Sequence, residues 1–169
     1  MQLSPDFARP SIHKKIKEVL NSGDGFKTKE LQPGDKLHAF GTAAVTQTLS
    51  HEAGHATYPY KSDFSSKSAY VSGALADEGA ATMNNIKVQR EILATGGPDI
   101  GIAGNGANHP VYNKAYDQLL KDSNATAARQ TIGQQFGNGE ISSVKVGGKN
   151  LTYNEYYGSW YDKAYPPKK

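Results

Sequence analysis

The chain has 169 residues, enough for one hydrophobic core and short for two, so we expect a single domain over residues 1–169. The net charge of +3 is modest and most basic residues are scattered, so we expect no nucleic-acid partner. Cysteine is absent, so any metal site must be built from His, Asp and Glu side chains.

The sequence also bears on how the protein is located. No apolar run is long enough to cross a bilayer, so we expect no membrane span. The N-terminal residues MQLSPDF lack the basic and apolar regions of a classical secretory signal. If the protein leaves its cell, we therefore expect another route, or a chain that is a piece of a longer protein.

Hydrophobic periodicity predicts two long helices in the first part of the chain. Apolar residues at helical spacing indicate a shorter helix over 10–20, followed by a turn-rich polar stretch with one short strand at most. A helix is expected over about 38–57, which contains no proline and much alanine. After a polar loop, a second long helix is expected over about 68–94.

The remaining residues predict shorter elements. A glycine-rich loop is expected over 95–110, followed by helices over 110–120 and 125–136, the second capped by Ser123 or Asn124. A hairpin is expected over 142–153, with its turn at Gly147-Gly148. A last helix begins with a Thr152-x-x-Glu155 capping box and runs to about residue 165. The expected fold class is therefore mainly α (α+β), a compact helical domain with a small hairpin near the C-terminus.

The sequence His51-Glu52-Ala53-Gly54-His55 lies in the helix expected over 38–57. Two histidines four residues apart project from one helix face, so both imidazoles can reach the same cation. Glu52 follows the first histidine and can contact a metal-bound water, which gives two ligands and a general base in five residues. Gly54 is costly inside a helix, which indicates that another backbone or a substrate approaches there.

A catalytic zinc site needs a third protein ligand and one open position. Glu78 is the main candidate, because it interrupts an otherwise mostly apolar or small row on the second long helix. That row consists of Val71, Leu75, Glu78, Thr82, Ile86, Gln89 and Leu93. A buried carboxylate without a partner is expensive, and metal coordination removes the problem. Asp77 is the neighbouring alternative ligand, since an error of one residue in helix phase is easy.

His109 is a further candidate, placed after the glycine-rich loop and before the helix expected from Pro110. It is either a ligand or, in the interpretation preferred here, a catalytic donor to the oxyanion that forms on a peptide carbonyl. A histidine that only caps the loop is an equally good interpretation. Six tyrosines are alternative donors: Tyr112, Tyr116, Tyr153, Tyr156, Tyr157 and Tyr161.

The HEAGH motif, followed by a glutamate on the next helix, resembles the gluzincin branch of the HExxH zinc metallopeptidases, the zincins. The resemblance implies a compact zincin-like domain in which His51, His55 and Glu78 bind Zn²⁺ and Glu52 is the base. In that family, Asn precedes the ligand glutamate, and an Asp four residues after it orients the first histidine. Here Asp77 and Thr82 occupy these two places.

Thr82, Asn84 or Asn85 is therefore expected to support the ligand histidine in place of that Asp. The longer string DEGAATMNNIKVQREIL is also similar in style to small HExxH effector peptidases that bacteria secrete as toxins. This second resemblance implies delivery into a target cell by a specialised secretion system, a cognate immunity protein as partner, and a chain that ends a longer delivery protein.

The sequence thus predicts a zinc metallopeptidase whose substrate is a protein or peptide, with the glycine-rich loop 96–106 as a mobile rim of the site. Two alternatives stay open. One is an amidase acting on cell-wall peptide, which would use the same metal chemistry. The other is a non-catalytic binding module whose zinc is fully coordinated, with His109 as the fourth ligand.

Overall fold

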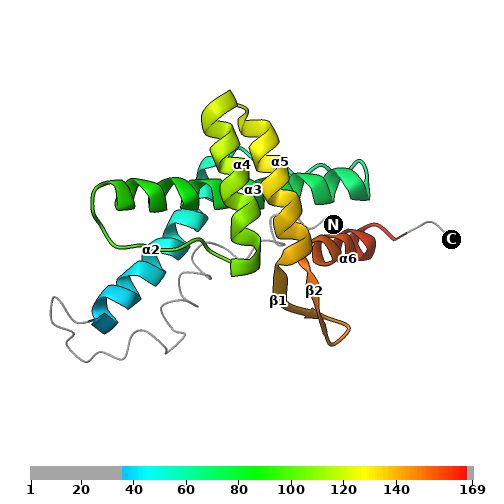
Figure 1. The fold of residues 1–169 in the computed structure, drawn as a ribbon. Helices are drawn as coiled ribbons and strands as arrows, with labels where there is room; N and C mark the ends of the chain where they lie inside the picture. The colour runs from blue at the N-terminus through cyan, green and yellow to red at the C-terminus, as the bar shows by residue number, and fades with distance from the viewer. Residues whose placement is uncertain (1–35, 167–169) are drawn as a thin grey trace.

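The computed structural model describes residues 36–166, and it describes side chains from residue 41 onward. Residues 1–35 and 167–169 are outside this part, so the helix expected over 10–20 and the short strand after it lie outside the described residues. The described chain is mainly helical with one small antiparallel hairpin near the C-terminus, which confirms the expected fold class (Figure 1).

Both long helices are present with nearly the expected bounds. Helix α2 spans Lys36–Thr57 and helix α3 spans Lys67–Ala94. The Ser66 side chain caps α3 by accepting a hydrogen bond from the Ala69 N–H. None of the described helices is long and apolar enough for a membrane crossing.

The next elements follow the expected order. A short 3-10 helix, η2 (Gly106–Asn108), leads into α4 (His109–Asp122). Helix α5 (Ala125–Gly139) is capped by Asn124, one of the two expected caps, whose side chain accepts from the Ala127 N–H.

The hairpin and the last helix complete the fold. Strands β1 (Ile141–Val146) and β2 (Lys149–Thr152) are joined at Gly147 and Gly148, whose φ angles of 58° and 80° suit a tight two-residue turn. Helix α6 (Tyr153–Ala164) begins with the expected capping box between Thr152 and Glu155.

Helix α3 is the centre of the domain, and glycines allow two helices to cross it closely. A Cβ on Gly54 of α2 would lie 2.5 Å from Ala81 Cα. On α5, a Cβ on Gly133 would meet the backbone carbonyl of Leu75, and Gly79 of α3 likewise faces the α5 backbone. In Figure 1, α3 lies in the middle while α5 crosses in front of it. The Gly54 crossing therefore brings the motif on α2 directly onto α3.

The main hydrophobic core lies between α3, α4 and α5. Its buried members are Ile86, Ile102, Tyr112, Ala115, Tyr116, Ile132 and Phe136. The row predicted on α3 is buried over its central part, including Leu75, Glu78 and Thr82. Leu93, at the end of the row, is 45% exposed, and in Figure 1 the C-terminal end of α3 extends past α4 and α5.

Candidate metal centre

The structure brings together the three residues predicted as metal ligands. His51 Nε2 and His55 Nε2 each lie 3.4 Å from the same oxygen, Glu78 Oε2. One ligand atom from each of the three residues can be chosen so that all lie within 4.8 Å of one another. His51 and Glu78 are buried, and His55 is mostly buried. These residues could hold a metal ion.

The spacing of these atoms fits a cation better than direct hydrogen bonds. Ligand bonds of about 2.0 Å in a tetrahedral site place the ligand atoms roughly 3.3 Å apart. Strong N–H···O hydrogen bonds are shorter, at about 2.7–3.2 Å. The two separations of 3.4 Å therefore match the edges of a tetrahedron around one ion.

The charges of the cluster suit a cation as well. Burial raises the pKa of the Glu78 carboxyl, but the two histidines outweigh burial and hold this pKa well below its usual range. Burial likewise lowers the pKa of His55, whereas Asp77 and Glu78 raise it to about 9. A metal ion entering the site must therefore displace a proton from His55.

Two further contacts orient the ligands. His55 Nδ1 lies 2.8 Å from Asp77 Oδ2, so Asp77 faces the ring nitrogen that points away from the cluster. The Tyr157 hydroxyl donates to Glu78 Oε1 at 2.7 Å, which leaves Oε2 facing the two Nε2 atoms. Glu78, rather than Asp77, therefore belongs to the group that could hold a metal ion, and Asp77 contacts the ring of one member of this group.

The residues expected to support the histidine rings do something else. Asn84 donates to the Ser50 carbonyl at 2.6 Å, and Asn85 donates to the Ser50 hydroxyl at 2.8 Å. Asn84 therefore holds the backbone, and Asn85 the side chain, of the residue just before His51, and these hydrogen bonds do not join either asparagine to a ligand ring. Thr82 Oγ1 and His51 Nδ1 are both buried without a hydrogen-bond partner within residues 41–166.

Glu52, the expected general base, is buried beside His51 on α2. Burial raises the pKa of the Tyr153 hydroxyl, and Glu78, Glu140 and Glu52 raise it further. The Tyr153 hydroxyl therefore stays protonated and lies within electrostatic reach of both the expected base and the third ligand.

Tyr153 is held beside the cluster by aromatic packing. Its ring lies 4.7 Å from the ring of Phe136, and the Phe136 ring stacks on His51 at 6.3 Å. Three of the other tyrosine hydroxyls are engaged: Tyr157 donates to Glu78, Tyr112 to Glu140 and Tyr161 to the Phe64 carbonyl. Tyr157 thus makes a direct contact with the cluster, whereas Tyr153 is linked to it through the Phe136 ring and its hydroxyl is not engaged with Glu78.

His109 begins α4, and its ring centroid lies 6.2 Å from that of Tyr112. Its Nε2 atom is buried and has no hydrogen-bond partner among the described residues. The group of possible ligands found in that part of the chain consists of His51, His55 and Glu78, without His109. The structure therefore does not bring His109 into the ligand set.

The glycine-rich loop expected to form a mobile rim is anchored by hydrogen bonds. Asn85 Oδ1 accepts from the Ala103 N–H at 2.7 Å. The buried Glu140 carboxylate accepts from the Asn105 N–H, the Asn108 side chain and the Tyr112 hydroxyl. These contacts fix the loop to α3 and to the end of α5.

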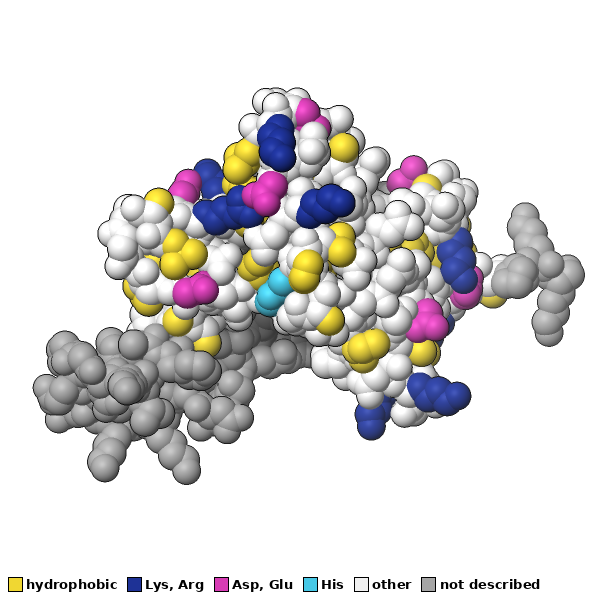
Figure 2. Space-filling view, in the orientation of Figure 1, with side chains coloured by type: hydrophobic (Ala, Val, Ile, Leu, Met, Phe, Trp, Pro, Cys, Tyr) yellow, Lys and Arg dark blue, Asp and Glu magenta, His cyan; other side chains and the backbone are white. Residues whose placement is uncertain are grey.

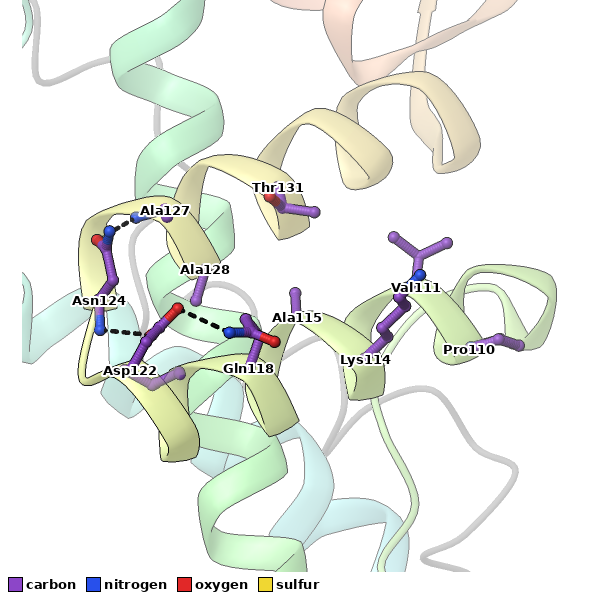
Figure 3. A pocket seen from close by; sticks show the side chains of 11 residues that line it. Pro110, Val111, Lys114, Ala115, Gln118, Asp122, Asn124, Ala127, Ala128 and Thr131 are labelled. Atoms are coloured by element: carbon purple, nitrogen blue, oxygen red, sulfur yellow. Dashed lines mark hydrogen bonds between the residues drawn. The ribbon is translucent and has the colours of Figure 1, made fainter.

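A separate pocket lies between α4 and α5, as Figure 3 shows. Its lining residues include Val111, Ala115, Leu119 and Ala128, with Lys114 and Asp122 among the polar ones. None of the three possible ligands lines it. This pocket is therefore distinct from the metal centre.

Sequence reasoning missed the roles of Asp77 and Tyr157. The sequence predicts Asp77 only as an alternative ligand to its neighbour Glu78. In the structure, Asp77 instead contacts Nδ1 of His55. Tyr157 lies 79 residues from Glu78 and carries no local signal, so only the docking of α6 on α3 reveals it. Comparison with known proteins gave no matching family model, no matching curated protein and no matching solved structure.

Proposed function

We propose that the protein is a zinc-dependent metallopeptidase with its active site at His51, Glu52, His55 and Glu78. The observation that carries the proposal is that the two Nε2 atoms of the HEAGH histidines converge on one Glu78 oxygen at 3.4 Å each. Two imidazoles and one carboxylate are a common ligand set of catalytic zinc, and three protein ligands leave a fourth position open.

A zinc ion held there would polarise the scissile carbonyl and lower the pKa of a water toward neutrality. Glu52 is the base that accepts the water proton and later passes it to the leaving amine. Asp77 holds the His55 ring through Nδ1, and Tyr157 holds Glu78 through Oε1. Both contacts fix the ligand atoms before any metal arrives, which reduces the cost of forming the site.

Tyr153 is the donor that we assign to the developing oxyanion, in preference to His109. Its packing on Phe136, which stacks on His51, and its raised pKa support the role of a protonated donor. His109 lacks a described contact with the ligand group. His109 is not in the group of possible ligands found in the described residues, so that group gives no support to His109 as a fourth ligand.

The substrate class and the biological setting are further proposals. A bare catalytic motif in a short chain supports a secreted effector peptidase with an immunity protein, by the sequence resemblance alone. The same site chemistry would serve an amidase on cell-wall peptide. Incubation of the zinc-loaded protein with casein and with purified sacculi separates these two substrates by the products released.

The central test is the zinc content of the wild type, His51→Ala and Glu78→Ala after dialysis against trace zinc. We expect about one zinc per wild-type chain and a loss in both variants, since removing one of three ligands weakens a zinc site strongly. Lys87→Ala, an exposed change on the same helix as Glu78, is the matched control and should keep its zinc. A wild type that cannot be loaded with zinc contradicts the proposal.

A further inference from the structure

The hairpin carries an unusual concentration of exposed apolar side chains. Ile141, Val144 and Val146, three of the large hydrophobic residues exposed in the described chain, all lie on the six residues of β1. Their side chains are 59%, 48% and 37% exposed. Apolar side chains gathered on one strand indicate a surface that another molecule covers.

The backbone of β1 is available on one side. The described sheet has two strands, so β1 pairs with β2 and has no strand on its other edge within residues 36–166. Val146 and Lys149 flank the two-residue turn and form a hydrogen-bonded pair, so the N–H and C=O of Lys145 point away from β2. An edge with unpaired backbone groups is a template for an extended chain.

The charges of the hairpin select among possible occupants. Lys145 and Lys149 are the only charged residues between Ile141 and Asn154, and neither forms an ion pair with a described carboxylate. Figure 2 shows two basic side chains at the lower end of the molecule, where Figure 1 places the hairpin, with exposed hydrophobic side chains just above them. An acidic strand complements this surface.

A second copy of the chain is a poorer occupant. Pairing of two β1 edges in antiparallel register would bring Lys145 of both copies close together in the new sheet, and like charges across strands are destabilising.

The base of the hairpin is fixed, because the Tyr153 N–H donates to the Glu140 carbonyl and the Asn150 side chain donates to the Ser142 carbonyl. The pairing of β1 with β2 shifts register between Ile141 and Lys145, so the regular edge offered to a docked strand lies at Lys145 and Val146.

We propose that the free edge of β1 binds an extended, acidic peptide segment of another protein as a third strand. The bound segment forms backbone hydrogen bonds to β1, covers the exposed Val144 and Val146, and places a carboxylate beside Lys145. Lys149 lies on β2 and adds positive charge at longer range. This interaction does not depend on the metal centre, so it can succeed or fail independently of the proposed function.

Fluorescence anisotropy with three labelled ten-residue peptides tests the proposal. One peptide alternates threonine and glutamate, the second has lysine in place of glutamate, and the third repeats the first with N-methyl groups on alternate backbone nitrogens. We expect the first peptide to bind about tenfold more tightly than either of the others. The lysine peptide loses the charge pairing with Lys145, and the N-methylated peptide loses strand hydrogen bonds.

Reversing the charge of the two hairpin lysines should make the protein bind the lysine peptide more tightly, a gain that a misfolded variant would not show. Lys145→Glu combined with Lys149→Glu should weaken the acidic peptide about tenfold and strengthen the lysine peptide. Lys114→Glu combined with Lys121→Glu, two exposed lysines of α4, is the control and should keep the wild-type preference.

Three results would overturn the proposal. Equal affinity for the acidic and basic peptides would mean that the charges of the hairpin do not select the bound segment. If the N-methylated peptide binds as tightly as the unmodified one, the peptide does not pair with β1 through backbone hydrogen bonds. Concentration-dependent dimerisation in sedimentation, abolished by a proline at Val144, identifies a second copy as the occupant instead.

Discussion

The Tyr157 hydroxyl donates a 2.7 Å hydrogen bond to Glu78 Oε1, although 79 residues separate the two in the chain. This contact joins α6 to the proposed zinc ligand on α3. With Oε1 engaged, the same carboxylate presents Oε2 to both histidines. The C-terminal helix therefore takes part in shaping a site whose ligands all come from α2 and α3.

We expect Tyr157→Phe to weaken zinc binding by about 10- to 100-fold, as loss of a contact that orients a metal ligand commonly does. Competition with a chromophoric chelator measures the affinity. Tyr161→Phe is the control, since its hydroxyl donates to the Phe64 carbonyl outside the ligand set. The visible spectrum of the cobalt-loaded proteins should change only for Tyr157→Phe. Equal losses of affinity in both variants would mean that α6 acts through general packing instead.

The two long helices, the hairpin turn and the capping box could be predicted because each depends on residues close together in the sequence. The same holds for the pair His51 and His55, which share a helix face by periodicity. Glu78 could be predicted because it is the one carboxylate in the mostly apolar or small row that faces inward on α3. The support from Tyr157 could not, because it depends on how α6 docks on α3, and that packing leaves no local pattern.

Glu52→Gln tests the general base. The variant keeps the shape of the side chain but cannot accept a proton, so peptide cleavage should fall by about 10²- to 10⁴-fold. Zinc content should stay at the wild-type level, because Glu52 is not among the possible ligands. Atomic absorption and a peptide-release assay on the same preparation measure both. Retained cleavage in the zinc-loaded variant would assign the base to another residue.

Gly54→Ala tests whether the close crossing of α2 and α3 builds the site. The added Cβ would lie 2.5 Å from Ala81 Cα, so one helix must move, at a cost of about 1–3 kcal/mol in the free energy of unfolding. Zinc affinity should fall as well, because the two histidines are on α2 and Glu78 is on α3, and the added methyl group would push these helices apart. Gly106→Ala, where a Cβ meets no atom within 4 Å, is the matched control.

Denaturant unfolding of metal-free protein and zinc titration provide the two measurements for Gly54→Ala and Gly106→Ala. If Gly54→Ala unfolds like the wild type and binds zinc with the same affinity, the crossing has room for a side chain and does not position the ligands.

The pKa of His55 predicts how zinc binding depends on pH. In the metal-free protein this pKa is about 9, above the ordinary value of 6.5, so the protonated ring stabilises the fold below pH 6.5 and this stabilisation is lost as pH rises through 9. Zinc requires the neutral ring, so its apparent affinity should rise with pH up to about 9 and flatten above.

Calorimetry in two buffers of different ionisation enthalpy measures the proton released per zinc at pH 8. Asp77→Asn removes a carboxylate that raises the pKa of His55, so the variant should release less proton at pH 8. An unchanged proton release in Asp77→Asn would mean that another group supplies the proton.

Tyr153→Phe and His109→Gln decide which side chain stabilises the oxyanion. We expect Tyr153→Phe to lower kcat by about 10²-fold with KM and zinc content unchanged, since loss of one oxyanion donor commonly costs this much. Tyr156→Phe, a neighbouring hydroxyl on α6, is the control for lost packing and should keep its kcat. His109→Gln should also keep its kcat, because the described contacts do not join His109 to the ligand group. If His109→Gln shows the loss and Tyr153→Phe does not, the donor is His109, and the Tyr153 hydroxyl does not act on the reacting carbonyl.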